Sequence, residues 1–501
     1  MRKCGILLPI SSLPSKYGIG TFGQEAYNFI DFLQKANQSF WQVLPLGPTS
    51  YGDSPYQSFC AFAGNPYFID LEILVQEGLL EKEDLSILID APLRIDYANL
   101  YQKRYDILRK AYSNFLNTDT YCYDKLEMTK FISANQDWIK DYAIFMSIKS
   151  LQNDLAWQNW DVKYRYYNKE VVDQYYKNYK MDVDFWFFLQ YQFNKQWQAL
   201  KDYAHKHNVE IIGDVPIYVS LDSSDVWSNT KLFQLDKNLR LTKVAGCPPD
   251  AFCEDGQFWG NPLYDYKVMK RDNYKWWINR IKKAQKLYDV IRMDHFRGFE
   301  SYYAIDATHA IAKYGKWEKG PGINFFNIIK KEIPNVRIIA EDLGFLTDKV
   351  LKLLKKTGFP GMKVLEFAFD SDEDNMYLPH NYSKNCVVYT GTHDNMPVRA
   401  WYNTLNGESK HRLKEYIMLQ NEDKICDQLI RVALASVSDL AIIPIQDYLG
   451  LGLDTRINTP STTTGNWTYR IEKKYLSNEL ALYMAFLSKL YKRYPNQVES
   501  N

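Results

Sequence analysis

Residues 290–294 are VIRMD, a short run of apolar and β-branched residues that ends in a carboxylate. Similar runs recur along the chain, and most of them also end in a polar or acidic residue: GILLPI (5–10), FWQVLPL (40–46), VEIIGD (209–214), VRIIAED (336–342), MKVLEF (362–367), CVVYTGTHD (386–394) and LAIIPIQD (440–447). Continuous apolar runs of this length are typical of strands buried on both faces, as in parallel sheets.

Helical patterns lie between several of these runs. Apolar residues recur at helical spacing at Ala26, Phe29, Ile30 and Leu33, and again at Trp186, Leu189, Phe193, Trp197 and Leu200. The alternation predicts an α/β fold, a (β/α)8 TIM barrel whose active site forms at the carboxyl ends of the strands. A doubly wound open sheet would alternate in the same way, but no Gly-rich phosphate loop follows the first run, which favours the barrel.

The length of 501 residues would suit about three domains, yet an elaborated barrel can reach it alone. We expect residues 1–501 to form a single catalytic barrel with large inserted, mainly helical subdomains. The gap at residues 47–208 is too long for one βα loop and predicts an insertion between the second and third strands. Within it, residues 92–185 are expected to form a helical subdomain that includes amphipathic helices at 102–115 and 139–151.

The charge balance excludes several classes of partner. Lys and Arg number 61 against 60 Asp and Glu, so a net charge of +1 gives no field that would hold nucleic acid or an anionic membrane. No apolar stretch is long enough to span a membrane. Seven scattered cysteines without zinc spacing favour a reduced, cytoplasmic setting. Aromatic residues make up 16% of the chain, and Tyr is the one in excess.

In chain order, the fourth, fifth and seventh runs are 290–294, 336–342 and 386–394. Their ends contain the acidic residues Asp294, Glu341 and Asp394. Arg292 precedes Asp294 by two positions, so both side chains can face the barrel mouth, where the cation favours an ionised carboxylate. Glu341, beside another carboxylate and an apolar wall, is expected to have a raised pKa, as a general acid requires. His393 and Asp394 complete the set. Each pair alone would more often be structural, but together they allow a retaining glycosidic mechanism.

Long ordered motifs connect the chain to a known family. They are GILLPISSLPSKYGIGTFG (5–23), WQVLPLGPTSYGDSPYQSFCAFAGNP (41–66), IIGDVPIYV (211–219), GCPPDAF with GQFWGNPLYDY (246–266), IRMDHFRGF (291–299), AEDLG (340–344), FPGMKVLEFAFD (359–370), YTGTHDN (389–395) and RINTPSTTTGNWTYR (456–470). Over essentially its whole length the chain resembles the amylomaltase or disproportionating-enzyme family of 4-α-glucanotransferases, glycoside hydrolase family 77.

The resemblance implies a role for each acid. Asp294 corresponds to the nucleophile that forms a covalent glycosyl-enzyme, Glu341 to the acid/base, and Asp394 to the carboxylate that holds and distorts the donor sugar. It also implies substrate-binding residues, namely Arg292, His393, Asp214, Trp259, Tyr56, Ser58 and Asn466. Two active-site loops, 246–261 and 456–467, are expected to face each other across the substrate.

The resemblance further implies the reaction. A segment of an α-1,4-glucan would pass to the 4-hydroxyl of glucose or another α-1,4-glucan, so the expected partners are maltooligosaccharides, starch or glycogen-type glucans and glucose. No cofactor is expected. Apolar residues of the first loop, Pro248, Pro249, Phe252, Phe258 and Trp259, could exclude water while an acceptor binds.

Three alternatives remain open. The same carboxylates serve a hydrolase of the wider α-amylase group if water replaces the sugar acceptor. Asp214, Asp294 and Glu341 end successive strands and could bind Mg²⁺ in a metal-dependent barrel enzyme, although Arg292 would compete for the same carboxylate, so we expect no metal. A glucan-binding scaffold without turnover would not need every carboxylate to be retained.

Overall fold

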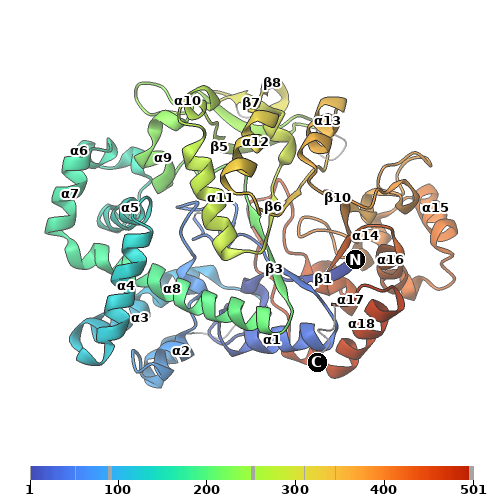
Figure 1. Ribbon diagram of the computed structural model, residues 1–501, viewed down its shortest axis with the longest axis horizontal. Coiled ribbons are helices and arrows are strands. Elements are labelled where there is room, and N and C mark those ends of the chain that lie inside the picture. Colours follow the sequence, from blue (N-terminus) through green and yellow to red (C-terminus); the bar gives the residue numbers. More distant parts are fainter. Residues whose placement is uncertain are drawn as a thin grey trace.

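A closed barrel of parallel strands forms the centre of the computed structural model, which describes residues 2–50, 52–88, 93–249, 254–309, 311–344 and 346–495 (Figure 1). Its strands are β1 (Lys3–Leu7), β2 (Phe40–Gln42), β3 (Glu210–Val215), β6 (Val290–Met293), β9 (Ile338–Ala340), β10 (Gly361–Val364), β11 (Cys386–Tyr389) and β12 (Leu440–Pro444). Each of the eight apolar runs supplies one strand, and the strands close in chain order. The predicted (β/α)8 TIM barrel is therefore confirmed.

The strand register brings the acidic run ends to one rim. Asp214 on β3 pairs with Arg292 on β6, and Arg292 pairs in turn with Ile339 on β9. The hydrogen-bond ladder continues past the strand ends, because the Asp294 N–H donates to the Val215 carbonyl at 3.2 Å. Parallel strands end at the same side of a sheet, so these acids meet at the carboxyl-terminal mouth.

Helices cover the outside of the barrel. They are α1 (Gln24–Lys35), α8 (Lys180–Lys206), α11 (Lys275–Leu287), α12 (Ile323–Glu332), α13 (Asp348–Thr357), α14 (Val398–Thr404), α15 (Gly407–Ile417), α16 (Ile425–Ala435), α17 (Ile445–Leu449) and α18 (Asn478–Leu490). Both apolar faces predicted from the sequence, on α1 and α8, are buried. Between β10 and β11 the chain forms only short 3-10 turns, so one barrel unit lacks its α-helix. No helix of the described segments is long and apolar enough to cross a membrane.

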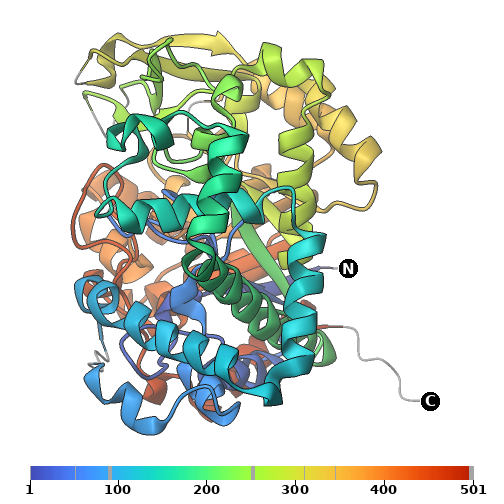
Figure 2. The ribbon, with the colours of Figure 1, turned by 90° about the vertical axis from the view of Figure 1, so that its left-hand side faces the viewer.

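A group of helices between β2 and β3 lies on one side of the barrel, at the left of Figure 1 and toward the viewer in Figure 2. The group consists of α2 (Leu71–Gln76), α3 (Tyr97–Asn117), α4 (Cys122–Ala134), α5 (Ile139–Leu151), α6 (Val162–Arg165) and α7 (Lys169–Asn178), together with the first part of α8. The amphipathic pattern expected for α5 is wrong. Every residue from Tyr142 to Lys149 is buried, because α7, α8 and α9 (Ser224–Ser228) all pack against α5.

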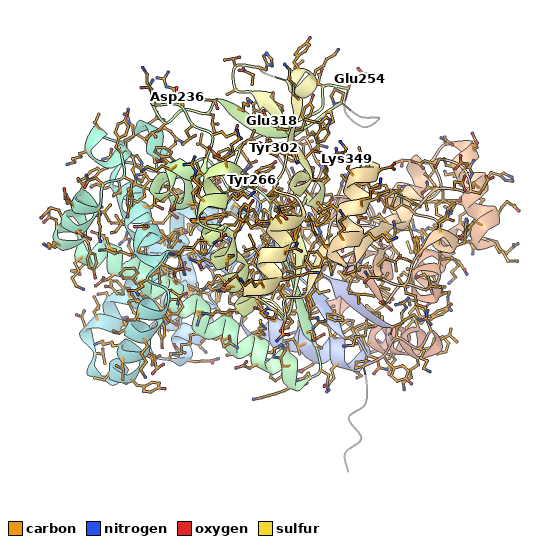
Figure 3. The ribbon with its side chains drawn as sticks, turned by 45° about the horizontal axis from the view of Figure 1, so that its top comes forward. Asp236, Glu254, Tyr266, Tyr302, Glu318 and Lys349 are labelled. Carbon is orange, nitrogen blue, oxygen red and sulfur yellow. The ribbon has the colours of Figure 1, made fainter. Side chains whose placement is uncertain are left out.

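A second sheet, which the sequence did not predict, stands at the top of Figure 1. Its antiparallel strands follow the order β5 (Gln257–Pro262), β4 (Lys243–Cys247), β7 (Ser301–Asp306) and β8 (Lys316–Lys319). Figure 3 labels Tyr302 and Glu318 there, and the Tyr302 hydroxyl donates to Glu318 Oε2 at 3.0 Å. The two ends of the expected loop 246–261 thus belong to the antiparallel strands β4 and β5. Short helix α10 (Tyr266–Arg271) follows β5.

Trp197 on α8 offers a test of how firmly the insertion is tied to the barrel. Its side chain is 1% exposed, its ring packs against Phe22 at 5.0 Å, and its Nε1 donates to the Leu287 carbonyl. Trp197→Ala should lower the free energy of unfolding by about 3–5 kcal/mol, because it leaves a cavity. Urea unfolding followed by circular dichroism measures this change. Met181→Ala on the same helix, where the side chain is 70% exposed, should shift it by less than about 0.5 kcal/mol.

Candidate active site

The guanidinium of Arg292 lies at the centre of the barrel mouth, where it is 3% exposed on its side chain. Its Nη1 donates to Asp214 Oδ2 and lies 3.6 Å from Asp294 Oδ1, and its Nη2 lies 3.7 Å from Glu341 Oε2. Burial alone would lower the pKa of Arg292, but the carboxylates, Asp214 first, raise it well above its ordinary value. The group therefore stays charged and neutralises part of the negative charge around it.

Asp294 and Glu341 share this cation and do not behave as independent carboxyls. Burial raises the pKa of both side chains above their ordinary values, and Arg292 opposes that rise in both cases. Asp294 also raises the pKa of Glu341, so protonation of one carboxyl depends on the charge of the other. A pair of this kind can hold one ionised and one protonated carboxyl near neutral pH.

The backbone at His295 selects which oxygen of Glu341 carries the proton. The His295 N–H donates to Glu341 Oε2 at 2.6 Å, and Arg292 Nη2 lies 3.7 Å from the same oxygen. Because Oε2 accepts these contacts, a proton on Glu341 is placed on Oε1. His295 adopts a left-handed conformation with φ of 46°, a strained geometry of the kind often found at functional sites.

Asp294 retains access to the mouth. Its side chain is 24% exposed, and its Oδ2 accepts from the Ile217 N–H at 3.3 Å. The other oxygen, Oδ1, is the one that faces Arg292. The carboxylate is therefore held by one backbone donor and one cation, yet remains reachable from outside.

Asp394 is the most open of the three acids, with 42% of its side chain exposed. Asn458 Nδ2 donates to its Oδ1 at 2.6 Å, and Arg456 Nη2 donates to its backbone carbonyl at 2.7 Å. Neither Asn458 nor Arg456 was predicted from the sequence to take part in the site. The 456–467 segment is thus anchored directly to an acid of the mouth.

Tyr56 connects the two sides of the mouth. Its hydroxyl donates to Asp214 Oδ2 at 2.7 Å and so accepts from His393 Nε2, which lies 2.8 Å away. The two rings stack at 5.4 Å, and burial lowers the pKa of His393, which is therefore neutral with its proton on Nε2. Trp467 packs on the Tyr56 ring at 5.7 Å. His393, expected to bind substrate, is 2% exposed and directs Nε2 to Tyr56.

Trp259 on β5 lies beside His295, the residue whose N–H binds Glu341. Its ring meets the His295 ring edge to face at 4.9 Å, and its Nε1 donates to Gln257 Oε1 at 3.0 Å. Burial lowers the pKa of His295 to about 3, so this ring is neutral. His295 was not predicted from the sequence, because its contact with Glu341 is made by a backbone N–H, which every non-proline residue has.

Two predicted substrate-binding residues make their hydrogen bonds within their own loops. Ser58 Oγ donates to the Cys60 carbonyl at 2.9 Å, and Asn466 Oδ1 accepts from the Thr459 N–H at 2.9 Å. Neither is joined to the carboxylates by a hydrogen bond. Phe258 of the expected apolar loop is 42% exposed, and Phe252 lies outside the described residues.

The donor set does not suit a metal ion. Within the described part of the chain no group of three or more His, Cys, Asp or Glu side chains is arranged to hold one. Arg292 already lies among Asp214, Asp294 and Glu341, the carboxylates that the metal-dependent alternative requires.

A closed parallel barrel with carboxylates at its carboxyl-terminal mouth defines a (β/α)8-barrel enzyme of the glycosidase type. The profile of glycoside hydrolase family 77, described as 4-alpha-glucanotransferase, matches residues 8–476. The chain belongs to this family, which confirms the resemblance and the enzyme class expected from the sequence.

Individual relatives are similar to this chain over almost their whole length. A 4-alpha-glucanotransferase of Clostridium butyricum is 50% identical over 488 residues, covering 97% of this chain and 99% of the relative. One from Streptococcus pneumoniae serotype 4 is 45% identical, covering 98% and 97%. The solved structure of amylomaltase from Streptococcus agalactiae in complex with acarbose matches with a TM-score of 0.95 at 40% identity, covering 99% of this chain and all of that one.

Replacing Arg292 tests whether its charge sets the pKa of the carboxyl groups in the mouth. Its cation lowers the pKa of Asp294, so Arg292→Met should raise that pKa and leave the carboxylate ionised only at higher pH. The acidic limb of the kcat/KM profile should move upward by about 1–3 pH units. The profile is measured between pH 4 and 9. Arg337→Met, which removes a cation paired with Glu210 on the surface, is the matched control; an unmoved limb in Arg292→Met would contradict the assignment.

Proposed function

We propose that the protein transfers a segment of an α-1,4-glucan to the 4-hydroxyl of glucose or another α-1,4-glucan by a retaining double displacement. The observation that carries this proposal is the pair of Asp294 and Glu341 beside one buried guanidinium, with Asp394 close enough to raise the pKa of both carboxyls. Membership of the 4-alpha-glucanotransferase family supports it. The acarbose complex of the Streptococcus agalactiae relative supports an oligosaccharide as the occupant of the mouth.

In the first step, Asp294 attacks the anomeric carbon of the donor sugar. The C1–O4 bond breaks as Glu341 gives the proton on its Oε1 to the leaving oxygen, and a glycosyl ester forms on Asp294. Arg292 favours the ionised nucleophile, and the His295 N–H keeps the other oxygen of Glu341 out of the transfer. The leaving glucan departs with the proton.

In the second step, Glu341, now ionised, removes the proton from the 4-hydroxyl of an acceptor sugar. That oxygen attacks C1, the ester bond to Asp294 breaks, and Glu341 ends protonated as it began. Two inversions give net retention, and one α-1,4 bond replaces another. The reaction therefore needs no cofactor and no energy input.

The remaining groups act on the donor sugar. Both transition states carry positive charge near C1, which the carboxylates of the mouth stabilise. Asp394, more than two-fifths exposed and fixed by Asn458, can accept from sugar hydroxyls. The Tyr56 ring, which Trp467 packs against at 5.7 Å, can contact the apolar face of the sugar. Trp259, on the opposite rim, reduces access of water while the acceptor binds.

The partners and location follow the same proposal. Maltooligosaccharides, starch or glycogen-type glucans serve as donors, and glucose or a shorter glucan as acceptor. A net charge of +1 suits an uncharged substrate that needs no electrostatic steering. We place the protein in the cytoplasm, where its six described cysteines remain free thiols.

Incubation with maltotriose separates transfer from hydrolysis. Transfer should produce free glucose and a ladder of longer maltooligosaccharides while the number of reducing ends stays constant, because each bond broken is replaced. Chromatography of the products and a reducing-end assay measure both quantities. A steady rise in reducing ends would identify the protein as a hydrolase of the same mechanism.

Asp294→Asn and Glu341→Gln test the two catalytic assignments. Each should lower kcat by about 10³-fold or more, because one removes the nucleophile and the other the proton donor. Glu300→Gln is the matched control, since the Glu300 carboxylate accepts from the neighbouring Ser301 hydroxyl and is not joined to the cluster. Turnover near that of the wild type in either catalytic variant would refute its role.

A further inference from the structure

The carboxyl group of Glu366 lies next to the turn that carries Asp394 and has no part in the proposed reaction. It follows β10 in the 3-10 turn Leu365–Phe367, and its N–H donates to the Thr390 carbonyl at 3.2 Å. The residue is 7% exposed. Its Oε1 has no hydrogen-bond partner among the described residues, which is unusual for a buried carboxyl.

The carboxyl packs directly on the backbone of residues 391–395. A Cβ placed on Gly391 would lie 2.7 Å from Glu366 Oε1, so only glycine leaves room for this contact. The Asn395 side chain lies beside Glu366, because the same Cβ on Gly391 would lie 3.1 Å from Asn395 Cβ. Asn395 Oδ1 accepts from the Thr392 N–H at 2.9 Å and from the Thr392 hydroxyl at 2.8 Å. The Asp394 N–H donates to that hydroxyl at 3.2 Å. Asn395 thus joins Glu366 to the turn that orients Asp394.

The charged groups that face Glu366 come from two other elements. Asp447, in α17, accepts from the Thr390 hydroxyl and from the Val398 N–H. Arg456, which follows the 3-10 turn Leu453–Thr455, donates to the backbone carbonyls of Asp394 and Asn458 at 2.7 Å each.

These neighbours favour the uncharged form of the carboxyl. Arg456 directs its donors to backbone carbonyls, so Glu366 has no hydrogen-bonded cation of its own. An ionised carboxylate in this position would be buried beside Asp447, which is costly. Burial and then Asp447 raise the pKa of Glu366 well above its ordinary value, while Asn395 and Arg456 oppose the rise.

We propose that Glu366 is a positioning residue for Asp394, acting through Asn395 as an uncharged hydrogen-bonding group that fixes the 391–395 turn. The inference rests on the proposed function, because its effect is seen through the action of Asp394 on the donor sugar. A carboxamide has the same shape as the neutral carboxyl and keeps an acceptor for Asn395. A side chain without polar atoms has neither.

Rescue by the carboxamide is the first test. With maltotriose as substrate, Glu366→Ala should lower kcat by about 10–100-fold, as expected when a reacting group moves by a fraction of an ångström. Glu366→Gln should stay within about threefold of the wild type. Should the alanine variant not fold, Glu366→Met fills the volume without polar atoms. A Gln variant as slow as Ala or Met, or an apolar variant as fast as the wild type, would overturn the proposal.

A double-mutant cycle with Asp394→Asn separates positioning from general damage. An α-maltosyl fluoride donor, which has a good leaving group, keeps the slow variants measurable. If Glu366 acts through Asp394, adding Glu366→Ala to Asp394→Asn should cost less than about twofold, whereas independent effects multiply. If Glu366→Ala lowers turnover by the same factor in the Asp394→Asn variant as in the wild type, the positioning role of Glu366 is refuted. Asp225→Ala, which removes another buried carboxyl that accepts from the Ala61 N–H, should show independent behaviour. Normal turnover of Asp394→Asn alone would instead contradict the proposed function.

Discussion

The guanidinium of Arg292 lies in a barrel mouth that otherwise collects carboxyl groups. The carboxylates of Asp214, Asp294 and Glu341 all lie within 4 Å of this guanidinium. Without the cation they could not all be ionised in a buried site, because each unpaired charge would be driven to bind a proton. One cation cannot neutralise all three. The remaining acids must share protons, and this shortage of positive charge allows an ionised and a protonated carboxyl to exist side by side.

That arrangement depends on strand register. Arg292 and Asp294 are two positions apart, and the pairing of Asp214 with Arg292 fixes the distance between neighbouring strands. A slip of one residue would turn the guanidinium to the outside of the barrel and leave Asp214 buried without its partner. The apolar residues that hold β3, β6 and β9 in place therefore determine the electrostatics of the mouth as well as the stability of the barrel.

The same dependence explains how much the sequence could predict. Strand-end acids such as Asp294 and Glu341 were predictable, because an apolar run followed by a carboxylate is a local pattern and the barrel brings such ends together. His295, Asn458 and Glu366 were not. The first acts through a backbone N–H that every residue possesses, and the other two act through contacts between segments far apart in sequence. The antiparallel sheet escaped prediction for a related reason: β4 and β8 are short and mix polar with apolar residues.

The origin of each group suggests a division of labour in the molecule. The barrel strands and the turns that follow them supply the charges. Other connections supply the groups that place them, with Tyr56 from the 47–208 insertion, Trp259 from β5 and Asn458 from the 456–467 segment. Two of these, Tyr56 and Asn458, hold acids directly, and Trp259 holds the residue whose N–H fixes Glu341. Because a change in any of these connections would move an acid without altering its charge, the connections control geometry and water access while the strands control protonation. The elaborations of the barrel thus help to place the carboxylates of the mouth and cannot be regarded as a separate appendage.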